Sequence, residues 1–399
     1  IVILYTRNFN EEALLFSAYL VGAEVFCRMT DSFVFYETGK YGVILFLSLG
    51  MFLGGLKQRV SIEFVFYIML LMLGIVFTKV PEGVSIRNAI MFNLSGPILL
   101  GAAAIYFYRR PLLNAKVIDT LFVMLLPLVS MVTYLFFKTL SLDEIVFGSA
   151  ANFQTSGGFG PIQVATVIGL GIFILLIFLL KKIRLTGYRI LDIAILFYFI
   201  FRGLLTFSRG GILATIVVII AFSIFYLLHE RGKIIPFLRY VATGIIFIIS
   251  IWVYTSNITG GMLVNRYTGK NARGIQKEDI TSGRVIILEN QLYNFLRHPL
   301  GLGVGNGKYN RDIGTDDPIA SHNEMGRLLE EHGLLGLIIL CGLLIIPLFN
   351  IFNVDNYQRA YLLSFYLFWL ITINHSAMRI AFPGFIYALS LIRITQYEE

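Results

Sequence analysis

Residues 161–180 read PIQVATVIGLGIFILLIFLL, an apolar run that contains no charged residue. An α-helix needs about 20 such residues to cross the hydrocarbon core of a membrane. Eleven further segments have a similar character. The twelve predicted spans are 12–28, 41–56, 62–79, 89–108, 117–138, 161–180, 188–206, 211–228, 237–256, 332–351, 360–375 and 380–394. We therefore predict an all-α integral membrane protein with about twelve transmembrane helices.

The composition also favours lipid as the solvent. Of the 399 residues, 57% are hydrophobic and 14% are charged, and the mean hydropathy is +0.77. A soluble domain has about 25% charged residues. The net charge of +8 fits basic side chains at membrane–water boundaries better than a nucleic-acid surface. Cys27 and Cys341 lie in or beside apolar segments and are expected to be packing residues, and no cleaved signal peptide is expected.

Basic residues are distributed unevenly between alternate loops. One set of loops, together with the chain ends, carries fifteen: Arg7, Lys57, Arg59, Arg109, Arg110, Lys116, Lys181, Lys182, Arg184, Arg189, Arg231, Lys233, Arg239, Arg359 and Arg393. The short loops of the other set carry seven: Arg28, Lys40, Lys79, Arg87, Lys138, Arg209 and Arg379. Loops rich in Lys and Arg face the cytoplasm. Both termini are therefore predicted to be cytoplasmic.

The long polar segment 257–331 is then extracytoplasmic and divides the chain into three parts. Residues 1–256 hold spans 1–9, residues 257–331 form a periplasmic loop subdomain, and residues 332–399 hold spans 10–12. In the loop, apolar residues recur on one helical face and predict an amphipathic helix on the bilayer surface or against the bundle. These residues are Val285, Leu288, Leu292 and Phe295.

The end of the loop contains turn and helix-start patterns. Glycines at 301, 303, 305 and 307 predict a tight, flexible turn and not a dinucleotide site. Residues Ser321 to Glu324 match the S-x-x-E capping box, which predicts the start of a helix. Gly333 and Gly336 follow in that helix, where they would permit close helix packing.

Six polar side chains within spans or at the predicted outer face are candidates for function. They are Arg202, Arg209, Arg284, His322, His375 and Arg379. Two arginines and a histidine beside lipid suit the binding of a lipid-linked diphosphate while a hydroxyl attacks it. Guanidinium groups bind phosphate oxygens in a planar fork and stabilise a leaving diphosphate. A neutral histidine can accept the proton of the hydroxyl.

Asp316 and Asp317 are the only candidate metal pair that we single out. Asp-Asp-Pro is also ordinary loop sequence, and we favour the loop. No metal ion and no cofactor are expected.

Three stretches of the sequence resemble the O-antigen ligase and polymerase superfamily of bacterial membrane glycosyltransferases. They are FRGLLTFSRGG at 201–211, TSGR at 281–284 with HPLGLGVG at 298–305, and SHNE at 321–324 with LLEEHGLLG at 328–336. Their order and spacing match over about 200–340. The first 200 residues resemble the family only as a series of spans.

The resemblance implies a metal-independent, inverting glycosyltransferase of the GT-C type in the bacterial inner membrane. Its donor would be a glycan on undecaprenyl diphosphate, and its acceptor a lipid-anchored or glycan hydroxyl. Carried over by motif, Arg209 and Arg284 would bind the diphosphate, and His322 would act on the acceptor hydroxyl. Residues expected to support them are Arg202, Ser208, Asn323 and Glu324.

The members of the superfamily differ in their acceptor. A ligase attaches O-antigen to the lipid A core, whereas a polymerase lengthens the lipid-linked chain, and we favour the ligase. A transporter or flippase with twelve spans is a competing class, but it would keep charged residues near mid-bilayer and show related halves. A scaffold protein would leave the Arg–His set unexplained.

The predicted orientation can be tested by cysteine labelling in a variant that lacks Cys27 and Cys341. In cells with a permeabilised outer membrane, Lys270→Cys should react with a membrane-impermeant thiol reagent, and Lys182→Cys should not. The opposite pattern would reverse the orientation.

Overall fold

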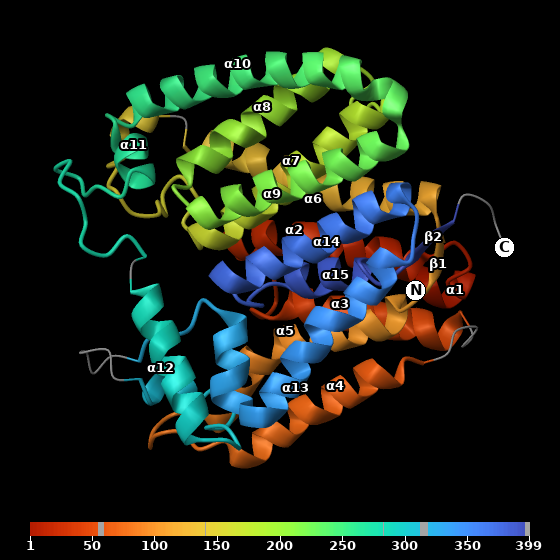
Figure 1. Ribbon diagram of the computed structural model, residues 1–399, viewed down its shortest axis with the longest axis vertical. Coiled ribbons are helices and arrows are strands. Elements are labelled where there is room, and N and C mark those ends of the chain that lie inside the picture. The colour runs from red at the N-terminus through yellow and green to blue at the C-terminus, as the bar shows by residue number, and fades with distance from the viewer. Residues whose placement is uncertain (55–59, 140, 282, 312–317, 396–399) are drawn as a thin grey trace.

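The computed structural model describes residues 1–54, 60–139, 141–281, 283–311 and 318–395. It is mostly helical, as predicted (Figure 1). Its α-helices are α1 (Val2–Thr6), α2 (Glu12–Met29), α3 (Thr38–Leu53), α4 (Ile62–Leu73), α5 (Ile86–Phe107), α6 (Asn114–Lys138), α7 (Pro161–Lys181), α8 (Arg189–Leu205), α9 (Arg209–His229), α10 (Ile234–Ile258), α11 (Met262–Tyr267), α12 (Arg284–Arg297), α13 (Glu324–Phe352), α14 (Asn356–His375) and α15 (Ala381–Leu389). Its 3-10 turns are η1 (Gly74–Phe77), η2 (Leu142–Glu144), η3 (Arg231–Lys233) and η4 (Gly307–Tyr309). Two short strands, β1 (Pro111–Leu113) and β2 (Arg393–Thr395), pair in parallel.

Helices α14 and α15 lie in the middle of the molecule (Figure 1). Helix α14 packs against α9, α15 packs against α5, and α7 contacts both α8 and α9. All nine residues of α15 are buried. The N-terminus and β2 lie at the right of Figure 1, whereas α11 and α12 lie at the left.

The predicted spans overlap helices, but their number is not confirmed. Within the described residues, six helices are long and apolar enough to cross a membrane: α5, α6, α7, α9, α10 from Phe237, and α13. Helix α3 and the α4–η1 pair are shorter apolar helices. The predicted last span, 380–394, contains the nine-residue α15, which is about 14 Å long and too short to cross alone. The count of twelve spans, and the side that each end faces, stay predictions.

Two basic residues that we assigned to short outer loops are buried in ion pairs. Arg28 pairs with Glu24 at 2.5 Å, and Lys40 pairs with Glu37 at 2.7 Å. The other carboxylate oxygen of Glu24 accepts the amide N–H of Ala381 at 2.5 Å. Helix α15 begins at Ala381 and has no side-chain cap of its own. The carboxylate of Glu24 therefore accepts a free N–H at its N-terminus, and its negative charge stabilises the helix dipole there. The α2–α3 hairpin is thereby tied to the central helix.

Helix α12, within the predicted loop subdomain, packs against α13. Helix α12 is present where the amphipathic pattern predicted it, but it contacts the bundle through a largely polar face that also buries Ile287. Gln291 and Asn294 are buried on that face, whereas Val285 and Leu292 are about half exposed. Asn294 donates to the buried carboxylate of Glu330 on α13 at 2.9 Å. Two of the four predicted apolar residues are therefore exposed, whereas Leu288 and Phe295 are partly buried and Leu288 lies close to Gly326 of α13.

A backbone break at Gly333 shapes the start of α13. Its φ of +58° and ψ of −133° interrupt the helix close to where span 10 was predicted to begin. The break leaves backbone N–H and C=O groups of α13 without hydrogen-bond partners inside the helix. The segment after α12 provides these partners. The N–H of Leu334 donates to Pro299 O at 2.8 Å, and the N–H of Leu302 donates to Glu330 O at 3.0 Å.

The glycine-rich segment is the tight turn that the sequence predicts. Gly301, Gly303 and Gly305 all have positive φ. They are packed closely against α13 and its neighbours, and not in an open, flexible loop. The turn thus holds the segment that leads to α13 against the bundle.

Gly333 should not tolerate a side chain. A Cβ at this position would lie 2.1 Å from Pro299 O, and its backbone conformation is one that L-residues avoid. Gly333→Ala should destabilise the purified protein by about 1–3 kcal/mol from backbone strain alone, read as a lower thermal unfolding midpoint. Gly342→Ala, in the same helix, is the control, because the nearest atom to its Cβ would be 3.9 Å away. Equal midpoints for the two variants would refute this account of the break.

Candidate active site

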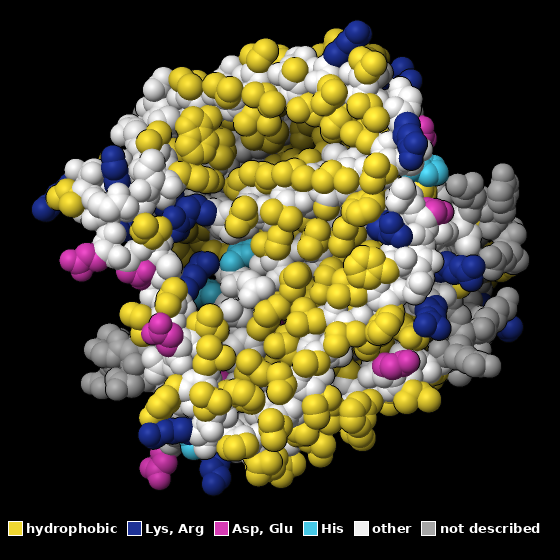
Figure 2. Space-filling view, viewed as in Figure 1, with side chains coloured by type: hydrophobic (Ala, Val, Ile, Leu, Met, Phe, Trp, Pro, Cys, Tyr) yellow, Lys and Arg dark blue, Asp and Glu magenta, His cyan; other side chains and the backbone are white. Residues whose placement is uncertain are grey.

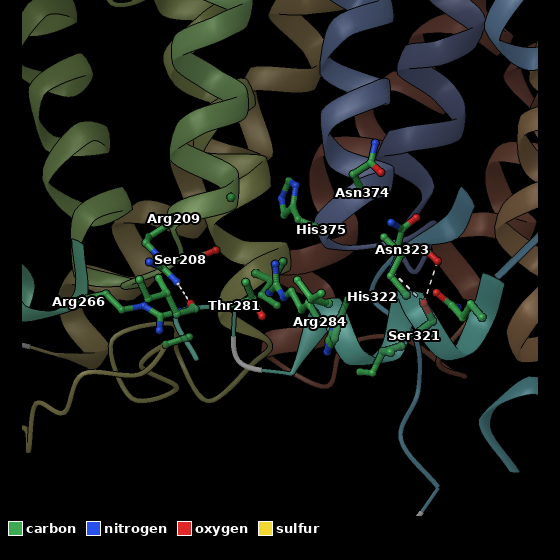
Figure 3. Close-up of a pocket in the computed structure, with 18 residues that line it drawn as sticks. Ser208, Arg209, Arg266, Thr281, Arg284, Ser321, His322, Asn323, Asn374 and His375 are labelled. Atoms are coloured by element: carbon green, nitrogen blue, oxygen red, sulfur yellow. Dashed lines mark hydrogen bonds between the residues drawn. The ribbon is translucent and has the colours of Figure 1, made fainter. Parts of the chain in front are cut away.

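A cavity of about 410 Å³ opens where several helices begin or end (Figure 3). It is formed by the start of α9, α11, the start of α12, the segment before α13 and the end of α14. Its polar and charged lining residues are Ser208, Arg209, Arg266, Thr281, Arg284, Gln291, Ser321, His322, Asn323, Asn374 and His375. The cavity thus brings together Arg209, Arg284 and His322, the three residues predicted to carry the chemistry.

Arg209 is the first residue of α9, after a sharp turn from α8. The Nη2 group of Arg209 donates to Ile280 O at 2.7 Å, which links it to the segment before α12. The next residue, Gly210, allows a close approach, since a Cβ there would be 2.6 Å from Cδ2 of His375. Ser208 lines the cavity at the N-cap position of α9, although its side chain makes no capping bond.

Arg284 begins α12 and has no hydrogen bond or ion pair with another described residue. The turn before it is shaped by Asp279, whose carboxylate accepts the N–H of Thr281 at 2.7 Å and the N–H of Gly283. Burial, followed by the nearby charge of Arg209, lowers the pKa of Arg284. A guanidinium remains charged at neutral pH. Arg284 therefore faces the cavity as a cation that has no ion-paired carboxylate among the described residues.

Arg266, on α11, is a lining residue that we did not predict. Its Nε donates to Phe207 O at 3.0 Å and its Nη1 donates to Ser149 O at 3.3 Å. Figure 3 shows Arg209 and Arg266 on one side of the cavity, His322 on the other side, and Arg284 between them. In the sequence Arg266 is one of several basic residues of the loop, with no motif around it that would have marked it.

His322 lies just before α13 and is partly buried. Burial, followed by the charges of Arg379 and Arg284 and by His375, lowers the pKa of His322 to about 4. The imidazole is therefore neutral at pH 7. Its Nδ1 is buried and has no hydrogen-bond partner among the described residues.

His375, at the end of α14, is the second histidine of the cavity. It is 6% exposed, and its Nδ1 donates to Ile371 O at 2.8 Å. Its Nε2 lies 3.3 Å from Thr166 Oγ1. Both ring nitrogens thus have partners in the protein, in contrast to His322.

The predicted capping box at Ser321–Glu324 is wrong in its details. The N-cap of α13 is Asn323, whose Oδ1 accepts the N–H groups of Met325 at 2.9 Å and Gly326 at 3.2 Å. Glu324 does not reach back to the chain before it, because its carboxylate binds Arg327. Asn323 lines the cavity, whereas Glu324 does not.

Arg202, predicted as a supporting residue, is not among the residues that line the cavity. It is 2% exposed, and its guanidinium donates to Thr139 Oγ1 and to Thr155 O, both at 2.8 Å. It therefore attaches the connection between α6 and α7 to α8. Arg379 makes a contact beside the cavity, since its Nη2 donates to Ser321 O at 2.9 Å.

The chemistry that this lining allows is the binding of an anion. Three guanidinium groups and two histidines face the cavity, and none of the described lining residues is Asp or Glu. No group of three or more His, Cys, Asp or Glu suited to a metal ion occurs in the described part of the chain. Asp316 and Asp317 lie outside the described residues. A phosphate-containing ligand matches three arginines in charge and in hydrogen-bond geometry.

Comparison with known proteins agrees with the motifs. The model of the O-antigen ligase family matches residues 194–341, the segment that contains Arg209, Arg266, Arg284 and His322. No curated protein and no solved structure matches the chain. Members of this family are ligase- or polymerase-type enzymes that act on glycans. The segment from α8 to the middle of α13 is thus similar to the O-antigen ligase family.

Proposed function

We propose that the protein is an O-antigen ligase-like inverting glycosyltransferase. It moves a glycan from undecaprenyl diphosphate to a hydroxyl of a lipid-anchored acceptor, the lipid A core, on the periplasmic face of the inner membrane. The observation that carries the proposal is the cavity itself. Its described lining offers three guanidinium groups and a neutral histidine with no carboxylate, inside the segment that matches the O-antigen ligase family.

In the proposed reaction the arginines bind the diphosphate of the donor. The bond between the anomeric carbon and the diphosphate oxygen breaks, and the diphosphate keeps the electron pair. Arg209 and Arg284 stabilise the negative charge that develops on it. Arg284 has no other ligand among the described residues, so its donors are available for this task.

His322 takes the proton of the acceptor hydroxyl as that oxygen forms its bond to the anomeric carbon. Attack on the face opposite the diphosphate inverts the configuration. The ring is neutral before reaction because its pKa is lowered to about 4. Binding of an anionic diphosphate offsets the cations that lower this pKa, so the same ligand that is to react also makes His322 a stronger base.

The surface beside the cavity suits a lipid-linked donor. Exposed apolar residues follow one face of α9 from the turn after Arg209: Leu213, Ile216, Ile220 and Ile224. Figure 2 shows the face of the molecule hollowed between α9 and α10, with hydrophobic side chains on both sides. A polyprenyl chain along this surface would lead its diphosphate to Arg209.

The other predicted residues then support the reacting groups. Asn323 fixes the start of α13 next to His322. Ser208 lies beside Arg209 in the cavity. Glu324 holds Arg327, and Arg202 fixes the α6–α7 connection, so their variants should affect folding more than the reaction itself.

The diphosphate role predicts that Lys cannot replace Arg. Arg284→Lys and Arg209→Lys should each lose most transfer activity, because a point charge does not reproduce the planar fork. Arg297→Lys, at the exposed far end of α12, should retain activity and serves as the control. Activity of either cavity variant within about twofold of wild type would contradict the diphosphate role.

The role of His322 predicts a particular pH dependence. Activity requires the neutral ring, so it should fall as pH drops through the pKa. The acidic limb of kcat/KM for the donor reports the free enzyme and should lie near pH 4, whereas the limb of kcat reports the complex and should lie at higher pH. His322→Ala should lose about 10²–10⁴-fold in kcat while it still binds donor. If the acidic limb of kcat lies at a lower pH than the acidic limb of kcat/KM, His322 is not the general base.

A metal-independent mechanism predicts that chelators have no effect. Transfer by the purified protein should proceed at the same rate with and without EDTA, because arginines meet the charge of the leaving group. Loss of activity on chelation, restored by Mg²⁺, would indicate instead that a metal ion bound by Asp316 and Asp317 stabilises the leaving group.

The proposed function is tested by incubating purified protein with undecaprenyl-diphosphate glycan, with and without lipid A core. A ligase forms one product, the glycan joined to the lipid A core, and only when that acceptor is present. Longer undecaprenyl-linked chains formed from the donor alone would identify a polymerase instead. Absence of both products would reject the glycosyltransferase proposal.

A further inference from the structure

We propose that Arg266 is a third diphosphate-binding arginine, which neither the sequence motifs nor the family match assigns. The inference rests on the proposed function, since it concerns the ligand of the same cavity. Its ligand class is a diphosphate ester, of which inorganic pyrophosphate is the simplest probe.

The orientation of Arg266 is fixed by two backbone carbonyls. Its Nε and Nη1 donate to Phe207 O and Ser149 O. The described residues provide no partner for its remaining nitrogen, Nη2, although the side chain lines the cavity. A guanidinium with two of its nitrogens anchored is preorganised, so it loses little conformational freedom when a ligand binds the third.

The charges around Arg266 also point to an anion. Burial, followed by the charges of Arg209 and Arg284, lowers its pKa. These three cations therefore lie close enough to repel one another, and the described lining contains no carboxylate to offset them. Several buried cations elsewhere in the molecule are paired with carboxylates, as in Arg311–Glu330 and Arg327–Glu331. A ligand with two or three negative charges would supply the missing compensation, and a diphosphate carries that charge.

A purely structural role is the alternative to exclude. Phe207 adopts a left-handed backbone conformation, with φ of +56°, in the turn that leads to Arg209. By donating to Phe207 O, Arg266 helps to hold that turn. This contact would make Arg266 important for stability even if it never touched a ligand. The test must therefore separate ligand binding from folding.

The experiment measures the binding of inorganic pyrophosphate to the full chain in detergent, by titration calorimetry and by the shift of the thermal unfolding midpoint. Wild type is compared with Arg266→Gln, Arg266→Lys and Arg284→Gln. Arg273→Gln is the matched control, because Arg273 is an exposed arginine of the same loop. Inorganic phosphate is the second probe.

The inference predicts that Arg266→Gln weakens pyrophosphate binding about 10–100-fold, the range for a lost hydrogen bond to a charged group. Arg266→Lys should bind more weakly than wild type and more tightly than the Gln variant, and Arg273→Gln should match wild type within about twofold. Phosphate should bind more weakly than pyrophosphate, because one phosphoryl group cannot engage all three guanidinium groups.

The outcomes separate this inference from the proposed function. If Arg284→Gln loses pyrophosphate and Arg266→Gln retains it, Arg266 is structural and only this inference falls. A lower unfolding midpoint for Arg266→Gln with an unchanged pyrophosphate shift has the same meaning. If wild type does not bind pyrophosphate at all, the diphosphate site itself is refuted. Equal affinity for phosphate and pyrophosphate would also overturn the inference, since it would indicate a general anion site.

Discussion

A charge buried in an apolar helix bundle costs several kcal/mol unless an opposite charge or a set of hydrogen bonds compensates it. This constraint governs the packing throughout the molecule. Arg28 and Lys40 are buried against Glu24 and Glu37, and Arg327 is buried against Glu324 and Glu331. Each of these pairs also joins segments or fixes a helix start. The cavity departs from the pattern, because its arginines have no carboxylate among the described lining residues.

A further buried ion pair, between Arg311 and Glu330, sets the geometry of the cavity. Glu330 on α13 accepts from Asn294 of α12 and pairs with Arg311 at 2.5 Å. Because Arg284 begins α12 and His322 precedes α13, this carboxylate fixes one of these cavity residues relative to the other. The break at Gly333 and the turn at Gly301–Gly307 then hold the connecting segment against α13. The packing of α12 on α13 and the geometry of the site therefore depend on the same contacts.

The helices and the three residues that meet in the cavity could be predicted from the sequence because both have local signals. Apolar runs of helical length mark the bundle, and Arg209, Arg284 and His322 lie within motifs. Arg266 could not be predicted, because its place beside Arg209 arises only when α11 folds back onto the turn between α8 and α9. Arg202 was assigned to the site as a polar residue of a predicted span within the 201–211 motif. In the structure its guanidinium instead binds the α6–α7 connection. The capping box failed because a buried arginine, Arg327, competes for the Glu324 carboxylate.

The central claim is that the diphosphate of a ligand compensates the positive charges of the arginines in the cavity. The most direct test is an experimental structure of the protein in a lipid environment with undecaprenyl diphosphate bound. The account predicts both phosphoryl groups within hydrogen-bond distance of the guanidinium groups of Arg209 and Arg284, with the polyprenyl chain leading away along α9. Phosphoryl groups bound elsewhere on the protein, with these arginines unliganded, would contradict it.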